Sequence, residues 1–485
     1  MKKKNANKIL IEDVLSISSE SQTIEFKRLA NEKVVAKVIE TVVAMANTEG
    51  GCIVLGVDDP EKTKLKGMER VFGIDEKIDI FDAISREIQR IIPPLSEIWP
   101  PKIIGVDADK RVGLLFIPKA VINFHSINNH VYVRIEKSNK RLNPHEIANF
   151  AYAKGFKKAD RELVDVDFCL LKTSFFQEWK QTRNIKGSSI EVVLEKTGLA
   201  RKQDNGKLLP TLAALLLFAE YPIDLTEAKA AIRVFQYTGT IETINETPNL
   251  IGIPKTIQGP IVKQIHDAHD YVLTLLRAGI KIPSGFKNVY QIPERAVKEA
   301  ITNAVIHRDY HMKRDVEVKI FEDRVEVESP GLFPYNITRM NIGLVRAEGY
   351  RNDLLVKHLR EFPSPPNLDQ NEGVKAMRQE MRVQNLYPPI FFTYPFYQDS
   401  VKVVLLNEYR PSEWEKISVY LSENKYITNE QARKLTGIVQ RDKMARMLKN
   451  WAKQGLLIQI IPHSGFVKGT RYKLSDSSEV VTTIS

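Results

Sequence analysis

The stretch Glu299–Tyr310, reading Glu-Ala-Ile-Thr-Asn-Ala-Val-Ile-His-Arg-Asp-Tyr, predicts a helix that carries a polar pair on one side. Glu299 and Asn303 are four residues apart, so a helix places their side chains next to each other. A carboxylate that orients a water molecule, beside an amide oxygen that ligates Mg²⁺, suits a bound nucleoside triphosphate. The same spacing fits a solvated polar stripe on an amphipathic helix, and spacing alone leaves both interpretations open.

This pair, with the His-Arg-Asp-Tyr that follows it, resembles the N-box of GHKL-type ATPases, the group of gyrase, Hsp90, histidine kinases and MutL. The whole string is similar to one branch of bacterial and archaeal proteins, the RecG-related or divergent AAA-4 transcriptional regulators, which lack the helicase motor. The resemblance implies a GHKL-like α/β sandwich that binds ATP with Mg²⁺ or Mn²⁺. It places Glu299 in a catalytic role and Asn303 on the metal. The cofactor-binding residues that it implies are Glu299, Asn303, His307, Arg308, Ser329, Gly331 and Gly373.

The nucleotide site departs from the GHKL pattern in two places. An aspartate that reads the adenine amino group is expected where this chain has Ser329, and of the glycines that follow it only Gly331 remains. The later glycine-rich stretch is reduced to Gly373, which offers fewer backbone N–H groups to a phosphate. A weak ATPase and a module that only binds nucleotide both stay open. The string Arg351-Asn-Asp-Leu-Leu resembles the Arg-Asn-Pro-Leu of the regulator branch.

Length and charge point to several domains and a polyanionic partner. The 485 residues predict about three domains that can each bury a core. Lys and Arg number 71 against 60 Asp and Glu, a net charge of +11, which favours DNA or RNA as the partner. Residues 411–474 alone carry twelve Lys or Arg and five Asp or Glu.

Cysteine content and hydropathy indicate a cytoplasmic protein. Only Cys52 and Cys169 are present, too few for a disulfide framework or a zinc site. The longest apolar run, Leu212–Ala219, is far too short to span a membrane. We therefore expect no membrane partner and a cytoplasmic location.

Four strings near the N-terminus carry a second resemblance. They are Glu20-Ser-Gln-Thr-Ile-Glu-Phe-Lys, Ala46-Asn-Thr-Glu-Gly-Gly, Leu55-Gly-Val-Asp-Asp and Tyr132-Val-Arg. In this order they resemble the AlbA-like (AlbA_2) domain of Schlafen proteins, which binds nucleic acid and in some members is a metal-dependent endoribonuclease. The resemblance implies that Glu20, Glu25 and Asp59 bind Mg²⁺ or Mn²⁺ and act in catalysis with Lys27. A surface ion pair between Glu25 and Lys27, with Asp59 as a turn residue, is the alternative.

Basic residues of the last predicted strand of this domain, and those after it, suggest a path for a phosphate backbone. Arg134, Lys140 and Arg141 are the candidates. A solvated basic edge would show the same charges, and the family resemblance favours binding.

The C-terminal segment has the element order of a winged helix, three helices followed by a two-stranded ribbon. On the predicted helix Arg441–Gln454, the apolar residues share one face, which leaves Arg441, Lys443, Arg446 and Lys449 outward. Such a helix can enter a major groove, while Lys468 and Arg471 on the wing contact phosphates. A winged helix that contacts proteins is the alternative.

The predicted architecture is an α/β multidomain chain with five parts. These are an N-terminal α+β domain of AlbA/Schlafen type (1–155), a helical connecting domain (156–285), a degenerate GHKL-like domain (286–410), a winged helix-turn-helix (411–475) and a tail (476–485). We expect a transcriptional regulator that forms a homodimer or a higher homo-oligomer and in which nucleotide state biases DNA binding. The competing hypothesis is a Schlafen-type metal-dependent nuclease in stress response or phage defence.

Overall fold

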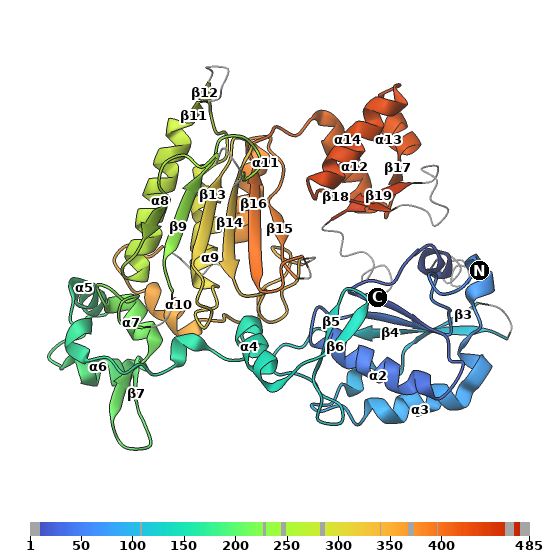
Figure 1. Ribbon diagram of the computed structural model, residues 1–485, viewed down its shortest axis with the longest axis horizontal. Coiled ribbons are helices and arrows are strands. Elements are labelled where there is room, and N and C mark those ends of the chain that lie inside the picture. Colours follow the sequence, from blue (N-terminus) through green and yellow to red (C-terminus); the bar gives the residue numbers. More distant parts are fainter. Residues whose placement is uncertain are drawn as a thin grey trace. The chain divides into compact units, whose positions relative to one another are not determined.

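The computed structural model divides into two compact units, Met1–Ala148 with Glu413–Ser485, and Asn149–Ser412. Figure 1 shows the elements of each along the chain. The structure describes residues 10–106, 109–226, 229–243, 249–281, 287–339, 341–366, 373–394, 396–460 and 470–475. It is a mixed α/β protein with several sheets, as the sequence predicts.

The N-terminal part contains a four-stranded sheet in the order β1-β2-β4-β3. Its strands are β1 (Ile24–Lys27), β2 (Gly51–Leu55), β3 (Lys102–Gly105) and β4 (Arg111–Ile117), and only the β1–β2 pair is parallel. The helices here are α2 (Lys33–Ala46) and α3 (Ile78–Ile88), while α4 (Pro144–Lys154) begins here and ends in the second unit. A separate hairpin, β5 (Tyr132–Ile135) and β6 (Ser138–Arg141), contacts α2.

The turn between α2 and β2 needs glycine. Gly50 has a φ of +74°, and a Cβ there would lie 2.6 Å from the carbonyl oxygen of Ile117. This close approach lets the buried strand β2 start directly after the helix and pair with β1 on one side and β4 on the other.

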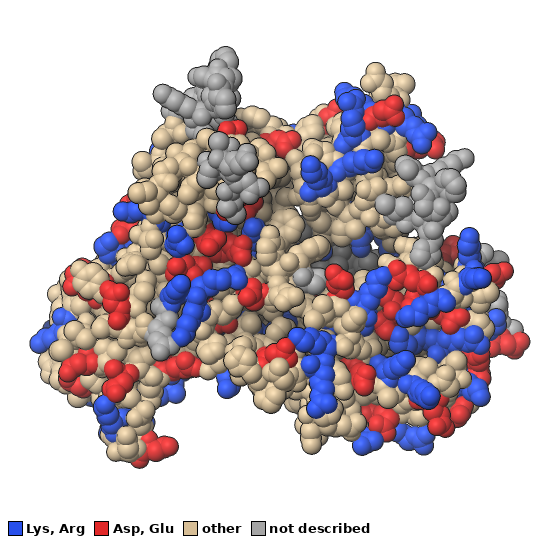
Figure 2. Space-filling view, viewed as in Figure 1, with Lys and Arg blue, Asp and Glu red and all other residues tan. Residues whose placement is uncertain are grey.

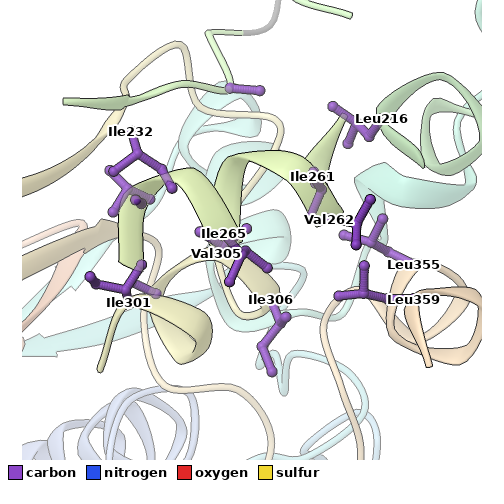
Figure 3. Packing of buried hydrophobic residues seen from close by; sticks show 14 of the residues in the cluster. Leu216, Ile232, Ile261, Val262, Ile265, Ile301, Val305, Ile306, Leu355 and Leu359 are labelled. Atoms are coloured by element: carbon purple, nitrogen blue, oxygen red, sulfur yellow. The ribbon is translucent and has the colours of Figure 1, made fainter. Parts of the chain in front are cut away.

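The second unit is built around a six-stranded sheet in the order β10-β9-β13-β14-β16-β15. Its strands are β9 (Ile232–Gln236), β10 (Lys255–Ile257), β13 (Val316–Ile320), β14 (Arg324–Pro330), β15 (Ile390–Phe392) and β16 (Ser400–Leu406). Three helices belong with it: α8 (Ile261–Ala278), α9 (Glu294–Ile306) and α11 (Gly373–Val383). Figure 3 shows Ile232 of the sheet close to α8 and α9, whose apolar sides share one core.

The segment 156–285 supplies strands as well as helices. It contributes β9 and β10 to the sheet and α8 to the core beside it, so the sheet extends beyond the range 286–410. The remainder forms α5 (Ser174–Thr182), α6 (Ile190–Thr197), α7 (Leu212–Phe218) and the hairpin β7 (Ala200–Lys202) and β8 (Leu208–Pro210). Helix α7 is wholly buried, so the longest apolar run of the sequence is core. No helix in the described ranges has the length and apolar character that crossing a bilayer requires.

The C-terminal segment folds as three helices and a three-stranded sheet in the order β17-β19-β18. The elements are α12 (Ser412–Glu423), β17 (Ile427–Thr428), α13 (Asn429–Thr436), α14 (Arg441–Lys453), β18 (Leu457–Ile460) and β19 (Arg471–Leu474). Thr428 caps α13 by accepting a hydrogen bond from the Gln431 N–H. Trp414 and Trp451 meet edge to face at 5.2 Å between ring centroids and anchor α12 on α14.

A fully buried acid starts helix α10 (Asp353–Leu359) in the second unit. The Asp160 carboxylate accepts hydrogen bonds from the backbone N–H groups of Leu354 (2.9 Å) and Leu355 (3.1 Å), and its side chain is inaccessible. Burial raises the pKa of Asp160 to about 6, against the opposing effect of these two hydrogen bonds.

We predict that Asp160→Asn removes a pH-dependent loss of stability. A pKa raised by folding means that the folded state binds more protons, so stability falls as pH rises from the unfolded pKa through the folded one. The free energy of unfolding of the variant minus that of wild type should rise by up to about 3 kcal/mol between pH 4 and pH 7. Denaturant titration measures it, with the exposed Asp165→Asn as control; parallel curves for Asp160→Asn and wild type would contradict the prediction.

Candidate functional site

A cavity of about 460 Å³ lies beside α9, within the second unit. Its other walls come from β14, β16, the segment 331–351 and α11, and most of the lining is apolar. The predicted cofactor residues that line it are Glu299, Asn303, His307, Ser329, Gly331 and Gly373. The structure therefore brings together residues that the sequence separates by more than seventy positions.

The polar pair of α9 faces the start of α11. A Cβ on Gly373 would lie 2.6 Å from Glu299 Oε2 and 3.0 Å from Asn303 Nδ2, so only glycine fits there without a shift. Burial raises the pKa of Glu299, partly offset by Arg295. Within the described residues, Asn303 Nδ2 is buried without a hydrogen-bond partner. A polar ligand that accepts a hydrogen bond would satisfy it, so these residues fit a nucleotide, and the Asn303 amide oxygen could hold its Mg²⁺.

Ser329 stands where GHKL ATPases place the adenine-reading aspartate, and its hydroxyl is already engaged. Its Oγ donates to the carbonyl oxygen of Ala304 in α9 at 2.6 Å. This hydrogen bond ties β14 to α9. Because residue 329 is a serine, it offers the cavity no carboxylate. Recognition of a base would therefore depend on other groups of the lining.

Arg308 does not face the cavity, contrary to its expected role as a cofactor-binding residue. Its guanidinium is buried and donates to the carbonyl oxygens of Lys229, Met312 and Arg314. These contacts hold the chain between α9 and β13 against the residues before β9. Arg308 is a structural residue because its Nη2 group donates to backbone carbonyls.

Arg351 lines the cavity and Asn352 follows it, although sequence reasoning assigned neither residue a role. The Arg351 guanidinium is 2% exposed and donates to the carbonyl oxygens of His307, Ala153 and Leu332. Asn352 Nδ2 donates to the carbonyl oxygens of Ile306 (2.9 Å) and Arg308 (2.7 Å). The two side chains thus satisfy carbonyls at the end of α9. The sequence signal for this role was the string Arg351-Asn352, which the resemblance to the regulator branch already singled out.

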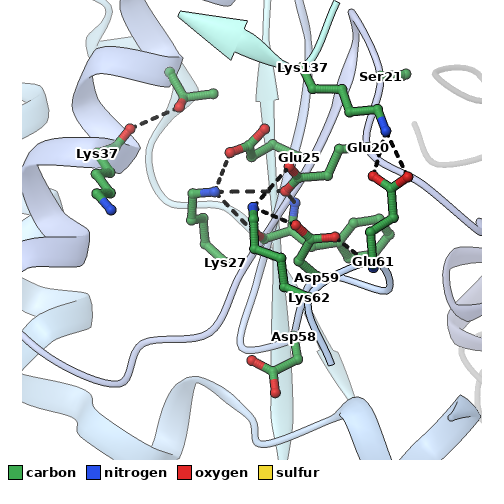
Figure 4. Close-up of polar contacts among 12 residues, drawn as sticks. Glu20, Ser21, Glu25, Lys27, Lys37, Asp58, Asp59, Glu61, Lys62 and Lys137 are labelled. Carbon is green, nitrogen blue, oxygen red and sulfur yellow. Dashed lines mark hydrogen bonds and ion pairs between the residues drawn. The ribbon is translucent and has the colours of Figure 1, made fainter. Parts of the chain in front are cut away.

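The three N-terminal acids lie close together, linked by two lysines, as Figure 4 shows. Lys27 Nζ contacts Glu25 and lies 3.7 Å from Glu20 Oε1. Lys62 Nζ lies 2.6 Å from Asp59 Oδ2 and 3.8 Å from Glu20 Oε2. The acids meet because Glu25 is on β1 while Asp59 follows the neighbouring parallel strand β2.

The charges of this acidic cluster are balanced within the protein. Burial, and then Glu25, raise the pKa of Glu20. Burial also acts to raise the pKa of Asp59, but hydrogen bonds from Lys62 and the Glu61 N–H outweigh it and lower that pKa. Across the described residues, no three His, Cys, Asp or Glu side chains are arranged to hold a metal ion. The cluster does not fit a divalent cation, because lysine ammonium groups occupy the space between its carboxylates.

Arg134 is a buried partner of this cluster and not a surface cation. It is 1% exposed and donates to Glu25, to Asn139 Oδ1 at 3.0 Å and to the Ser21 carbonyl oxygen at 3.2 Å. The expectation that it contacts phosphate is therefore wrong, since its charge compensates Glu25. Lys140 is half exposed and pairs with Glu146 at 2.6 Å, and Arg141 is exposed.

The exposed side of α14 is basic. Met444, Leu448 and Trp451 are buried. The predicted nucleic-acid contacts Arg441, Lys443, Arg446 and Lys449 are all exposed. Figure 2 shows Lys and Arg side chains on the surface of the three C-terminal helices. Arg471 at the start of β19 is also exposed, whereas Lys468 lies outside the described residues.

Two family models match this chain. Residues 20–143 match the family described as Schlafen, AlbA_2. Residues 313–405 match the family described as putative ATP-dependent DNA helicase recG C-terminal, a range that starts after α9. No curated protein matches the chain. The crystal structure of the DIP2311 protein from Corynebacterium diphtheriae is similar over 100% of both chains, at 18% identity and a TM-score of 0.39, values that do not establish a shared fold.

We predict that Gly373→Ala turns the Glu299 carboxylate away from the start of α11. The added methyl group would lie 2.6 Å from Glu299 Oε2, which is the end of a flexible side chain, so the carboxylate can move without a shift of the helix. The loss in free energy of unfolding should stay below about 1.5 kcal/mol, the cost of an off-rotamer side chain. Denaturant titration measures this loss, with Gly105→Ala as the matched control, because a Cβ there meets nothing within 4 Å. A much larger loss for Gly373→Ala than for the control would show that the helix itself must move.

Proposed function

Since the chain combines an AlbA-like Schlafen domain with a RecG-related ATPase-like domain, we propose that it is a nucleic-acid-binding transcriptional regulator that responds to a nucleotide. Both families point to a nucleic-acid-associated, ATP-binding protein. In this proposal the C-terminal segment is a winged helix that binds DNA, and the six-stranded unit is a GHKL-like module. The chain acts as a homodimer that reads two half-sites.

The basic exposed side of α14 carries this proposal. Four cations extend over about two turns of one helix, and their described neighbours form no ion pair with them. The opposite side of the helix is fixed in the core by Met444, Leu448 and Trp451. A rigid helix with a positive outer face is the element that enters a major groove in helix-turn-helix proteins.

The cavity supports the nucleotide response. An occupant that hydrogen-bonds Asn303 lies next to the start of α11, because Gly373 lines the same cavity and leaves no room for a Cβ beside Glu299 and Asn303. Binding would therefore favour one position of α11 over another. Such a shift alters DNA affinity only if the two positions differ in that affinity.

We predict that Arg441→Glu with Lys443→Glu weakens duplex DNA binding and its salt dependence. Each phosphate contact contributes about 0.9 to the slope of log affinity against log salt, so two lost contacts reduce the slope by about 2. Fluorescence anisotropy over a salt series measures both quantities. Lys202→Glu with Lys207→Glu is the control of equal charge change in the other unit. An unchanged slope in the α14 variant would remove this helix from the interface.

The same titration with ATP and Mg²⁺ tests the coupling. The proposal requires different DNA affinities with and without nucleotide. Equal affinities, together with no heat of ATP binding in calorimetry, would leave the DNA-binding part of the proposal standing without the switch.

A metal-dependent nuclease is the second candidate, favoured by the convergence of Glu20, Glu25 and Asp59. The ion pairs of the acidic cluster oppose it. A metal ion would have to displace Lys27 and Lys62 from carboxylates that they already neutralise.

We predict that labelled tRNA, single-stranded DNA and duplex DNA stay intact with Mn²⁺ while their mobility shifts. A gel assay measures cleavage and shift together. The double variant Glu20→Gln/Glu25→Gln is the comparison: cleavage by wild type that this variant loses would establish the nuclease and overturn the regulator proposal.

A further inference from the structure

The cavity beside α9 is lined mainly by apolar side chains. Its strand wall contributes Val327, Val401 and Val403, and the facing segment 331–351 contributes Phe333. A wall of this kind binds the apolar part of a ligand, and a few polar groups then set the orientation. The chemistry of the lining therefore indicates which part of a nucleotide the cavity can hold.

Aromatic rings in the wall suit a planar ligand. His307 and Tyr350 both line the cavity, and their rings stack with centroids 5.4 Å apart and planes 10° apart. Phe391 of β15 adds another ring. A heteroaromatic base can contact such rings by their faces or edges, and an acceptor on the base can satisfy the buried Nδ2 of Asn303.

Positive charge is scarce in this wall. Of the described residues that line the cavity, Arg295 and Arg351 are the only Lys or Arg. The Nη groups of Arg351 donate to backbone carbonyls, and Arg295 lies 3.5 Å from Glu380 Oε1. The sequence directly before α11, residues 367–372, contains two acids and no Lys or Arg. A triphosphate that enters the cavity would therefore lose its water without gaining a set of cations.

A carboxylate faces the position where a phosphate would be expected. The N-terminus of a helix favours an anion. At the start of α11, a Cβ on Gly373 would lie 2.6 Å from Glu299 Oε2, so an anion of the protein itself is already next to that end of the helix. The cations of α11 that follow, Lys375 and Arg378, are not among the described residues that line the cavity. A phosphate beside α11 would thus be repelled by Glu299.

We infer that the cavity recognises the uncharged nucleoside part of a nucleotide and gains little from the phosphates, so that it binds a nucleoside about as tightly as the triphosphate. The inference deepens the proposed function and rests on it, because it names the part of the nucleotide that the site reads. The apolar and aromatic wall contacts the base, Asn303 donates a hydrogen bond to it, and the phosphates stay in solvent. Binding then needs no Mg²⁺.

Isothermal titration calorimetry on the full chain tests this inference. It compares adenosine, guanosine, cytidine and uridine with their triphosphates, with and without Mg²⁺ and at low and high salt. For a base that binds, the affinities of nucleoside and triphosphate should agree within about threefold, without dependence on Mg²⁺. The heat capacity change should be negative, because apolar surface is buried.

Two outcomes differ in what they overturn. A triphosphate that binds more than about tenfold tighter than its nucleoside, or that binds only with Mg²⁺, would overturn the inference and leave the proposed function standing. If no nucleoside and no triphosphate binds, the nucleotide response in the proposed function fails, and the inference fails with it.

Variants place the ligand in the cavity. Asn303→Asp replaces the buried donor by an acceptor and should lower the affinity for the nucleoside about tenfold. Asn184→Asp makes the same change at an exposed position of the same unit and is the matched control. Equal affinities of these two variants for the nucleoside would contradict the inference.

A second variant tests the repulsion by Glu299. Glu299→Gln removes the carboxylate beside α11 and should raise the affinity for the triphosphate relative to the nucleoside about threefold, as expected for one charge pair largely in water. A lower ratio in this variant would show that Glu299 assists phosphate binding, which would overturn the inference.

Discussion

The cavity of the second unit depends on one buried guanidinium. Arg351 donates to carbonyls at the end of α9, after β14 and at the end of α4, three segments that no sheet pairing joins directly. Burying a charged group this deeply is unfavourable unless hydrogen bonds replace its water. The guanidinium also explains why residue 331 is glycine, since a Cβ there would overlap it. The three carbonyl groups must all lie within hydrogen-bonding reach of the Arg351 guanidinium, and this requirement fixes the cavity wall.

The N-terminal part uses charge in a comparable way. Glu25 is buried between Lys27 and Arg134, and Asp59 pairs with Lys62, so the carboxylates are compensated without a metal ion. Removing one partner of such a network leaves an uncompensated buried charge, which costs more than the pair contributes. The cluster therefore ties the hairpin β5–β6 to the edge strand β1 of the sheet.

Periodic features were predictable from the sequence, and long-range contacts were not. The four-residue spacing of Glu299 and Asn303 placed both on one side of α9, and the apolar positions 444, 448 and 451 correctly oriented α14. Arg134 and Arg308 were assigned to ligands because a sequence shows charge but not burial. Their partners, Glu25 and the carbonyl of Lys229, are 109 and 79 residues away. The strand β9 escaped prediction because its partner β13 lies beyond two helices, and β10 pairs only with β9.

That same pairing bears on how the second unit folds. Strand β9 pairs in parallel with β13, and Ile232 opposes Val316, so this contact closes a loop that contains all of α8 and α9. Closing a long loop costs chain entropy before the pairing stabilises anything, which slows folding of such sheets. The two helices can form first and offer an apolar platform on which β9 and β13 align. Until they do, β13 presents an unpaired edge to which a strand of another chain can pair, so the timing of helix formation governs how long that edge stays open.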